Sequence, residues 1–230
     1  TTGAVEELGR YLGLKKAPYR MECFDISHMQ GSETVASMVV FEGGVAKKSD
    51  YRRFKIRSAE GKPDDFKSMR EVTTRRYGAP DAEMPDLIVI DGGKGQLSSA
   101  LEIIRGAGHL LVPVVGLAKR EEEVFREGES EPVILPRDSQ ALFLIQRIRD
   151  EAHRFAITYH RRLRGKRNMV SVLDHIEGIG PKRRQLLYEH YGELEKIKEA
   201  SVEEMAGLDG MNRPAAEAVY NFFLAQRNLR

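Results

Sequence analysis

The sequence predicts two domains: an α/β domain with a mixed β-sheet flanked by helices, followed by a small all-α domain. Three observations support this prediction. Apolar runs suited to strands alternate with helical patterns over most of the chain. A polar stretch that contains a glycine follows at residues 165–169. Beyond it, two segments share one helical plan, which indicates an internal repeat.

The first part of the α/β domain is expected to contain one helix and three strands. A short amphipathic pattern precedes the first apolar strand, and two β-rich runs follow it. Gly43 and Gly44 separate these two runs, which is a hairpin signal. The expected elements are a helix at 2–13 and strands at 20–28, 34–41 and 45–56.

Helices and strands alternate in the second part of this domain. Asp64 is suited to cap the helix that follows it, and Ser139 precedes the longest helical pattern. Short, fully apolar runs between helices are typical of strands buried on both faces. The expected elements are helices at 66–77, 96–108 and 140–163, strands at 87–90 and 112–118, a turn at 92–95, and a hairpin between 121 and 137.

The stretch at 165–169 is the predicted domain boundary, because polar residues around a glycine are typical of a break between helical segments. The resulting domains are 1–165 for the α/β domain, 166–170 for a linker and 171–230 for the helical domain.

The helical domain contains the repeat. The segments 173–192 and 202–223 each predict a short helix, a tight glycine-containing turn and a second helix. Pro181 and Pro214 stand near the start of the second helices, where proline is best tolerated. Because one such unit would struggle to bury its apolar face alone, we expect the two to share a core.

The composition excludes several classes of protein. Hydrophobic residues make up 41% of the chain and charged residues 31%, as expected for a soluble protein with a substantial core. No apolar run is long enough to span a membrane, and the N-terminal residues do not resemble a signal peptide. Cys23, the single cysteine, cannot form an internal disulfide. We therefore expect a cytoplasmic protein without membrane contact.

Two of the apolar strands end on an aspartate. Asp25 ends the first strand, and Asp91 ends the strand at 87–90. Two buried strands that deliver carboxylates to one edge of a sheet could hold Mg²⁺, which favours oxygen ligands. For either aspartate alone, a turn or a helix cap is an equally good explanation, so the spacing leaves both interpretations open.

Other residues could extend such a site. His153, on the long helix, could ligate a metal or transfer a proton, or it could be a partly buried structural histidine. One of Asp64 and Asp65 is expected to cap a helix, and the other could be a third acid. Lys94 could contact a phosphate, or it could be an ordinary turn lysine. The GGKG segment around it lacks the spacing of a P-loop, so it is not an ATP site.

Glycine and basic residues form candidate contacts with a nucleic-acid backbone. Glycines at the tips of the two helical hairpins would let backbone amides approach a phosphate, and the following helix N-termini favour an anion. The alternative is an ordinary pair of helices with a glycine cap. The candidates are Gly178, Gly180, Lys182 and Arg183 in the first hairpin, and Gly210, Asn212 and Arg213 in the second.

A basic stripe precedes the helical domain. It contains Arg161 and Arg162, and no acid occurs between residues 154 and 167. Such a stripe could neutralise phosphates, or it could be a solvated helix face. The net charge of +2 does not by itself indicate a nucleic-acid partner.

Several segments together resemble the C-terminal half of the UvrC family of bacterial excision-repair nucleases. They are MECFDISHMQG, RRFKI, DDFKSMREVTTRRYG, PDLIVIDGGKGQL, RDEAHRFAITYHR and HIEGIGPKRRQLL, in the family's order along nearly the whole chain. The resemblance implies an RNase H-like endonuclease domain followed by a tandem helix-hairpin-helix domain. The family's catalytic acids fall on Asp25 and Asp91, its catalytic histidine on His153, and a further functional acid on Asp65.

The resemblance also implies a function. It implies an endonuclease that uses Mg²⁺ or Mn²⁺, held by Asp25, Asp91 and His153, to cut damaged or bubble DNA on the 5′ side of a lesion. The implied partner of the full-length protein is a UvrB–DNA complex, and we expect the docking segment to be absent from this sequence. Two alternatives remain: a non-catalytic DNA-binding scaffold, and a nuclease of the RNase H or junction-resolvase type.

Overall fold

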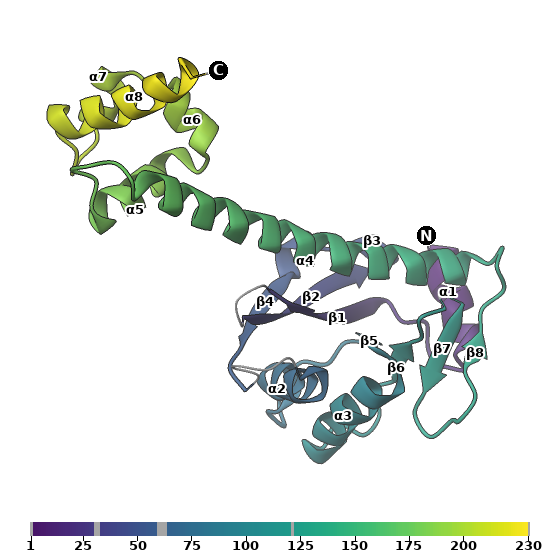
Figure 1. Ribbon diagram of the computed structural model, residues 1–230. Coiled ribbons are helices and arrows are strands. Elements are labelled where there is room, and N and C mark those ends of the chain that lie inside the picture. The colour runs from purple at the N-terminus through teal and green to yellow at the C-terminus, as the bar shows by residue number, and fades with distance from the viewer. Residues whose placement is uncertain (1, 30–32, 59–63, 121, 230) are drawn as a thin grey trace. The chain divides into compact units, whose positions relative to one another are not determined.

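The structure, a computed structural model, describes residues 2–29, 33–58, 64–120 and 122–229. It divides into two compact units, Thr1–Thr158 and Tyr159–Arg230, which are described separately here (Figure 1). Within the described residues, no helix is both long enough and apolar enough to cross a membrane.

The first unit is built on a mixed sheet that contains eight strands within the described residues. The strand order is β3-β2-β1-β5-β6-β7-β8, and β4 also pairs with β2. Strand β1 pairs antiparallel with β2 and parallel with β5, so the predicted mixed sheet is confirmed. The strands are β1 Arg20–His28, β2 Thr34–Glu42, β3 Val45–Ala46, β4 Arg52–Ile56, β5 Leu87–Asp91, β6 Val114–Leu117, β7 Glu123–Arg126 and β8 Val133–Ile134.

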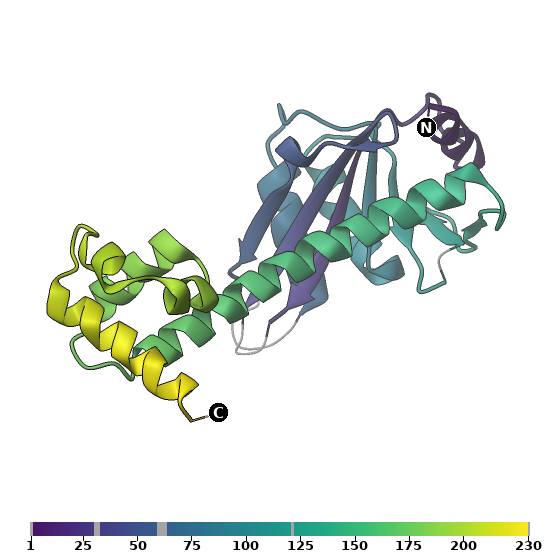
Figure 2. The same cartoon turned by 90° about the horizontal axis from the view of Figure 1, so that it is seen from above.

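Helices cover both faces of this sheet (Figures 1 and 2). Side chains alternate along each strand, so neighbouring residues enter different cores. Cys23 and Val89 pack in one core with α1 and α4, whereas Phe24 and Ile90 pack in the other with α2 and α3. The helices are α1 Thr2–Tyr11, α2 Asp65–Tyr77, α3 Gly93–Gly106 and α4 Gln140–Leu173. Asp25 and Asp91, two positions after Cys23 and Val89, therefore belong to the face that α4 covers.

Two local predictions in this unit were wrong. The run at 45–56 is not one strand, because a short 3-10 helix, η1 Lys48–Asp50, separates β3 from β4. Asp50, in this short helix, accepts a hydrogen bond of 2.6 Å from Arg20 on β1. The turn expected at 92–95 is also shorter than predicted, because α3 begins at Gly93.

The second unit is all-helical, as expected. It contains the end of α4, followed by α5 Pro181–Tyr191, α6 Leu194–Glu199, α7 Val202–Ala206 and α8 Arg213–Arg227. Residues from all these helices share one apolar core, which includes Leu173, Leu187, Ile197, Met205 and Val219. The first hairpin is formed by the end of α4 and α5, and the second by α7 and α8. Ser201 caps α7 by accepting from the Glu204 amide.

The break expected at 165–169 is wrong as a statement about secondary structure. Helix α4 continues through Gly165 and through the proposed linker at 166–170 to Leu173. A single glycine costs a helix only about 1 kcal/mol, and the apolar residues Met169 and Leu173 are buried in the second unit's core. The compact units divide at Thr158 instead, and the limits of the functional domains stay a prediction.

Candidate metal centre

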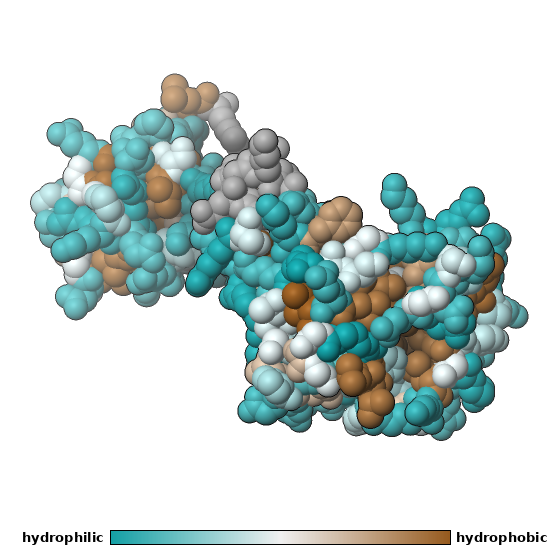
Figure 3. All heavy atoms as spheres, turned by 90° about the horizontal axis from the view of Figure 1, so that it is seen from below, coloured by the Kyte–Doolittle hydropathy of each residue, from teal (hydrophilic) through white to brown (hydrophobic). Residues whose placement is uncertain are grey.

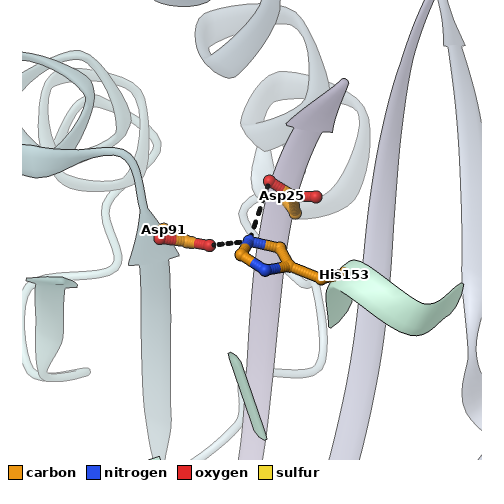
Figure 4. A group of neighbouring side chains, drawn as sticks. All are labelled: Asp25, Asp91 and His153. Carbon is orange, nitrogen blue, oxygen red and sulfur yellow. Dashed lines mark hydrogen bonds and ion pairs between the residues drawn. The ribbon is translucent and has the colours of Figure 1, made fainter. Parts of the chain in front are cut away.

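Three side chains meet at the carboxyl ends of β1 and β5. Asp25 stands directly opposite Asp91 in the parallel register of these strands. His153 reaches both from α4: its Nε2 lies 2.7 Å from Asp91 Oδ2 and 3.9 Å from Asp25 Oδ1 (Figure 4). The resemblance to the UvrC family implied that these three residues share one site, and the structure brings their side chains together.

This arrangement fits a divalent cation. One ligand atom from each of the three residues lies within 4.8 Å of the other two. Two carboxylates and one imidazole are a suitable ligand set for a divalent cation, and three protein ligands leave positions of a six-coordinate ion open to water or phosphate oxygens. The carboxylates are mostly buried, with 14% of the Asp25 side chain and 11% of the Asp91 side chain exposed, whereas 49% of His153 is exposed.

Burial and neighbouring charges shift the pKa of Asp25. The pKa of Asp25 is raised from 3.8 to about 6, first because burial disfavours the charged carboxylate. The charge of His153 opposes this shift, and the negative charges of Asp91 and Asp65 add to it. A cation bound beside Asp25 would favour its ionised form.

Arg149 is a site residue that the sequence analysis missed. Its Nε and Nη2 donate to Asp91 Oδ1 at 3.2 and 3.1 Å, and its Nη2 also donates to the Ala118 carbonyl at 2.5 Å. These bonds occupy Oδ1 and leave Oδ2 directed at His153. The signal was present in the sequence, because Arg149 precedes His153 by four positions and so lies on the same helix face.

The roles of the neighbouring aspartates are distinct. Asp64 caps α2 by accepting from the Lys67 amide at 3.0 Å, which confirms the predicted cap. Asp65 Oδ1 lies 2.5 Å from His28 Nε2, and Asp65 Oδ2 accepts from Gln96 at 3.3 Å. His28 and Gln96 were also missed, although His28 follows Asp25 on the same strand. The catalytic role of Asp65 stays a prediction.

Lys94 lies in the first turn of α3 rather than in an open turn. Its ammonium donates to the Ser130 carbonyl at 2.6 Å and lies 4.9 Å from the centre of the Phe125 ring. These contacts tie α3 to the loop after β7. A phosphate contact by Lys94 stays a prediction.

Both hairpin tips contain glycines in the left-handed region. Gly178 has φ of +84° and Gly210 has φ of +100°, conformations that side chains rarely adopt. Arg183 donates to the carbonyls of both glycines, at 2.9 and 3.4 Å, and so ties the two tips together. Arg183 therefore has a structural role at the hairpin tips, and a DNA contact by Arg183 stays a prediction.

The remaining candidates differ in their contacts. Asn212 caps α8 by accepting from the Ala215 amide at 2.9 Å. Arg213 pairs with Glu217 at 3.1 Å, although 64% of its side chain is exposed. Gly180 is the N-cap of α5 in an extended conformation. Lys182, Arg161 and Arg162 are exposed, and DNA contacts by all these residues stay predictions.

The fold and the site together define an RNase H-like endonuclease domain followed by a helix-hairpin-helix domain. Residues 9–157 match the family model of the UvrC RNase H endonuclease domain, and residues 170–223 match a SAM-like helix-hairpin-helix tandem. The chain belongs to the UvrC family.

Curated relatives agree with this assignment. UvrABC system protein C of Desulforudis audaxviator is 46% identical over 238 residues, which cover 96% of this chain and 39% of that protein. The protein of the same name from Salinibacter ruber is 49% identical over 225 residues, which cover 96% of this chain and 35% of that protein. The chain thus spans less than two thirds of the length of these relatives.

A solved structure is also similar to part of this chain. Endonuclease V of Ciona intestinalis in complex with DNA shares 17% identity over 51% of this chain, with a TM-score of 0.28. At that score the likeness is too slight to support an argument about fold or function.

Proposed function

We propose that this chain is a metal-dependent DNA endonuclease that makes the 5′ incision of nucleotide excision repair. The observation that carries the proposal is the convergence of Asp25, Asp91 and His153 at one sheet edge, in a chain that matches a family endonuclease domain. The convergence needs three distant segments, which a set of independent turn and helix caps would not require.

The three residues have distinct parts in this mechanism. Asp25 and Asp91 supply oxygen ligands, and Arg149 keeps Asp91 turned so that Oδ2 stays available. His153, half exposed, either completes the ligand set or carries a proton near the phosphate. A bound Mg²⁺ or Mn²⁺ would polarise the phosphate and lower the pKa of an attacking water. In-line hydrolysis would leave a 3′-hydroxyl and a 5′-phosphate.

The substrate is damaged duplex or bubble DNA. The helix-hairpin-helix tips would contact the phosphate backbone through amides near Gly178 and Gly210, which read shape and charge rather than base sequence. By analogy with the relatives' name, a UvrB–DNA complex would present this substrate to the full-length protein. A cytoplasmic location belongs to this proposal.

A nicking assay tests the proposal. Bubble duplex is incubated with Mn²⁺ and with wild type, Asp25→Asn, Asp91→Asn or the control Asp81→Asn, whose exposed side chain lies in the loop before β5. Wild type and the control should nick, and the two site variants should not. Calorimetric titration should detect Mn²⁺ binding by wild type and the control but not by the two site variants.

The same assay separates the alternatives. Absence of nicking by wild type, with intact DNA binding, would favour the scaffold. Faster cleavage of an RNA–DNA hybrid or a four-way junction than of bubble DNA would favour a nuclease of the RNase H or resolvase type.

A further inference from the structure

Phe66 is an exposed aromatic residue at the beginning of α2. It directly follows Asp65, and 55% of its surface is exposed. Seen from below, the first unit shows groups of hydrophobic side chains between hydrophilic ones (Figure 3). The exposure of Phe66 sets it apart from the buried residues of the core.

The Phe66 ring packs directly against Gly95. A Cβ placed at Gly95 would lie 2.3, 2.9 and 3.5 Å from Cε1, Cζ and Cδ1 of the ring, which are atoms of one edge. The ring therefore meets the first turn of α3 through its edge, and a side chain at position 95 would require the ring to shift. This contact gives a physical reason for glycine at position 95, which neither the P-loop comparison nor the metal centre explains.

The contact between Phe66 and Gly95 lies next to the candidate metal centre. Gly95 follows Asp91 by four residues, a stretch that can span at most about 14 Å, and α3 already begins at Gly93. Gln96, beside Gly95, donates to Asp65 at 3.3 Å. Asp65, the residue before Phe66, is close enough to Asp25 to raise its pKa, so the Phe66 ring belongs to the surroundings of the candidate metal centre.

The chemistry of Phe66 itself favours stacking with a flat, uncharged group. Asp64 and Asp65 stand directly before the ring and Lys67 directly after it, so the charges on either side are of both signs. A nucleobase carries no charge and presents a flat face, and stacking on an aromatic ring accepts any base. A base in intact duplex is already stacked on both sides, so only an opened strand could offer one.

We propose that Phe66 stacks on one unpaired base of the DNA strand, beside the phosphate to be cut. The inference rests on the proposed endonuclease function and deepens it, because the ring then selects opened DNA over closed duplex. Gly95 is the positioning residue that holds the ring edge-on.

A double-mutant cycle tests this contact. Affinity for bubble DNA is measured by fluorescence anisotropy in the uncleaving Asp91→Asn background of the whole chain. Single abasic nucleotides are placed in turn beside the predicted cut. One position should lose roughly tenfold in affinity, within the range for base–aromatic stacking. In Phe66→Leu the same position should show no further loss, whereas Phe66→Tyr should behave like the parent.

Two further variants keep the test decisive. Phe143→Leu removes another exposed phenylalanine, 45% exposed on α4, and should leave affinity unchanged. Gly95→Ala should displace the ring and reproduce the effect of Phe66→Leu, while thermal unfolding confirms that each variant folds. If Phe66→Leu retains the full abasic penalty, the inference is overturned even where wild type nicks DNA. If wild type does not nick bubble DNA, the proposed function is overturned instead. The double-mutant cycle still tests the base contact in that case, because it measures binding and not cleavage.

Discussion

Replacing Asp25 by asparagine should stabilise the metal-free protein while it abolishes metal binding. The folded state holds this carboxyl with its pKa raised to about 6, against 3.8 ordinarily, mainly because of burial. That gap corresponds to roughly 3 kcal/mol against the ionised form. Because Asp91 and His153 share the same electrostatic network, we expect a gain of about 1 to 3 kcal/mol in the free energy of unfolding at pH 8.

The sign of the pH dependence follows from the raised pKa. Below pH 3.8 the carboxyl is protonated in both states and costs nothing. As pH rises from 3.8 to about 6, the unfolded state loses the proton first, so wild type loses stability across this window. The asparagine variant lacks this loss, and its advantage over wild type should therefore grow between pH 4 and pH 7.

Urea unfolding in EDTA measures this advantage at each pH, with Asp81→Asn as the control. Added Mn²⁺ should then stabilise wild type, by about 2.7 kcal/mol at a hundred times its dissociation constant, and leave the variant unchanged. A variant that is less stable than wild type at pH 8, or an advantage independent of pH, would refute the reasoning.

Three further predictions concern individual residues. Arg149→Gln should lower kcat at least tenfold with little change in KM for DNA, because Asp91 would lose the bonds that orient it. The same change should weaken Mn²⁺ affinity, and an unchanged affinity would contradict a positioning role. Asp64→Ala should lower the free energy of unfolding by about 1 kcal/mol, as loss of a helix cap does, and keep nicking activity. Asp65→Ala should lower nicking activity with a smaller loss of stability. The reverse pattern would mean that the two residues have exchanged roles. Lys182→Glu should weaken DNA binding and reduce the steepness of its salt dependence by about 1 or more, with an unchanged unfolding midpoint, and an unaltered salt titration would exclude this contact.

Sequence reasoning succeeded where a local pattern has one structural solution. Apolar runs that end in aspartate predicted both the strands and the edge at which Asp25 and Asp91 lie. The position of His153 on the helix was also predictable. Its distance from the acids was not, because it depends on how α4 packs across the sheet.

The misses share a physical cause. Arg149 lies one helical turn before His153, but its bonds to Asp91 and to the Ala118 carbonyl join distant segments, so these contacts could not be predicted from the local pattern. Gly165 is a helix breaker only by propensity, and burial of Met169 and Leu173 outweighs its small cost. The interruption at Lys48–Asp50 depends on Arg20, a partner on another strand.

The direct register of Asp25 with Asp91 has a consequence for how the protein matures. β2, β4 and α2 lie between β1 and β5 in the chain, and α4 follows both strands. A chain synthesised only as far as β5 would contain both acids but not His153. The complete ligand set would therefore exist only in the finished fold.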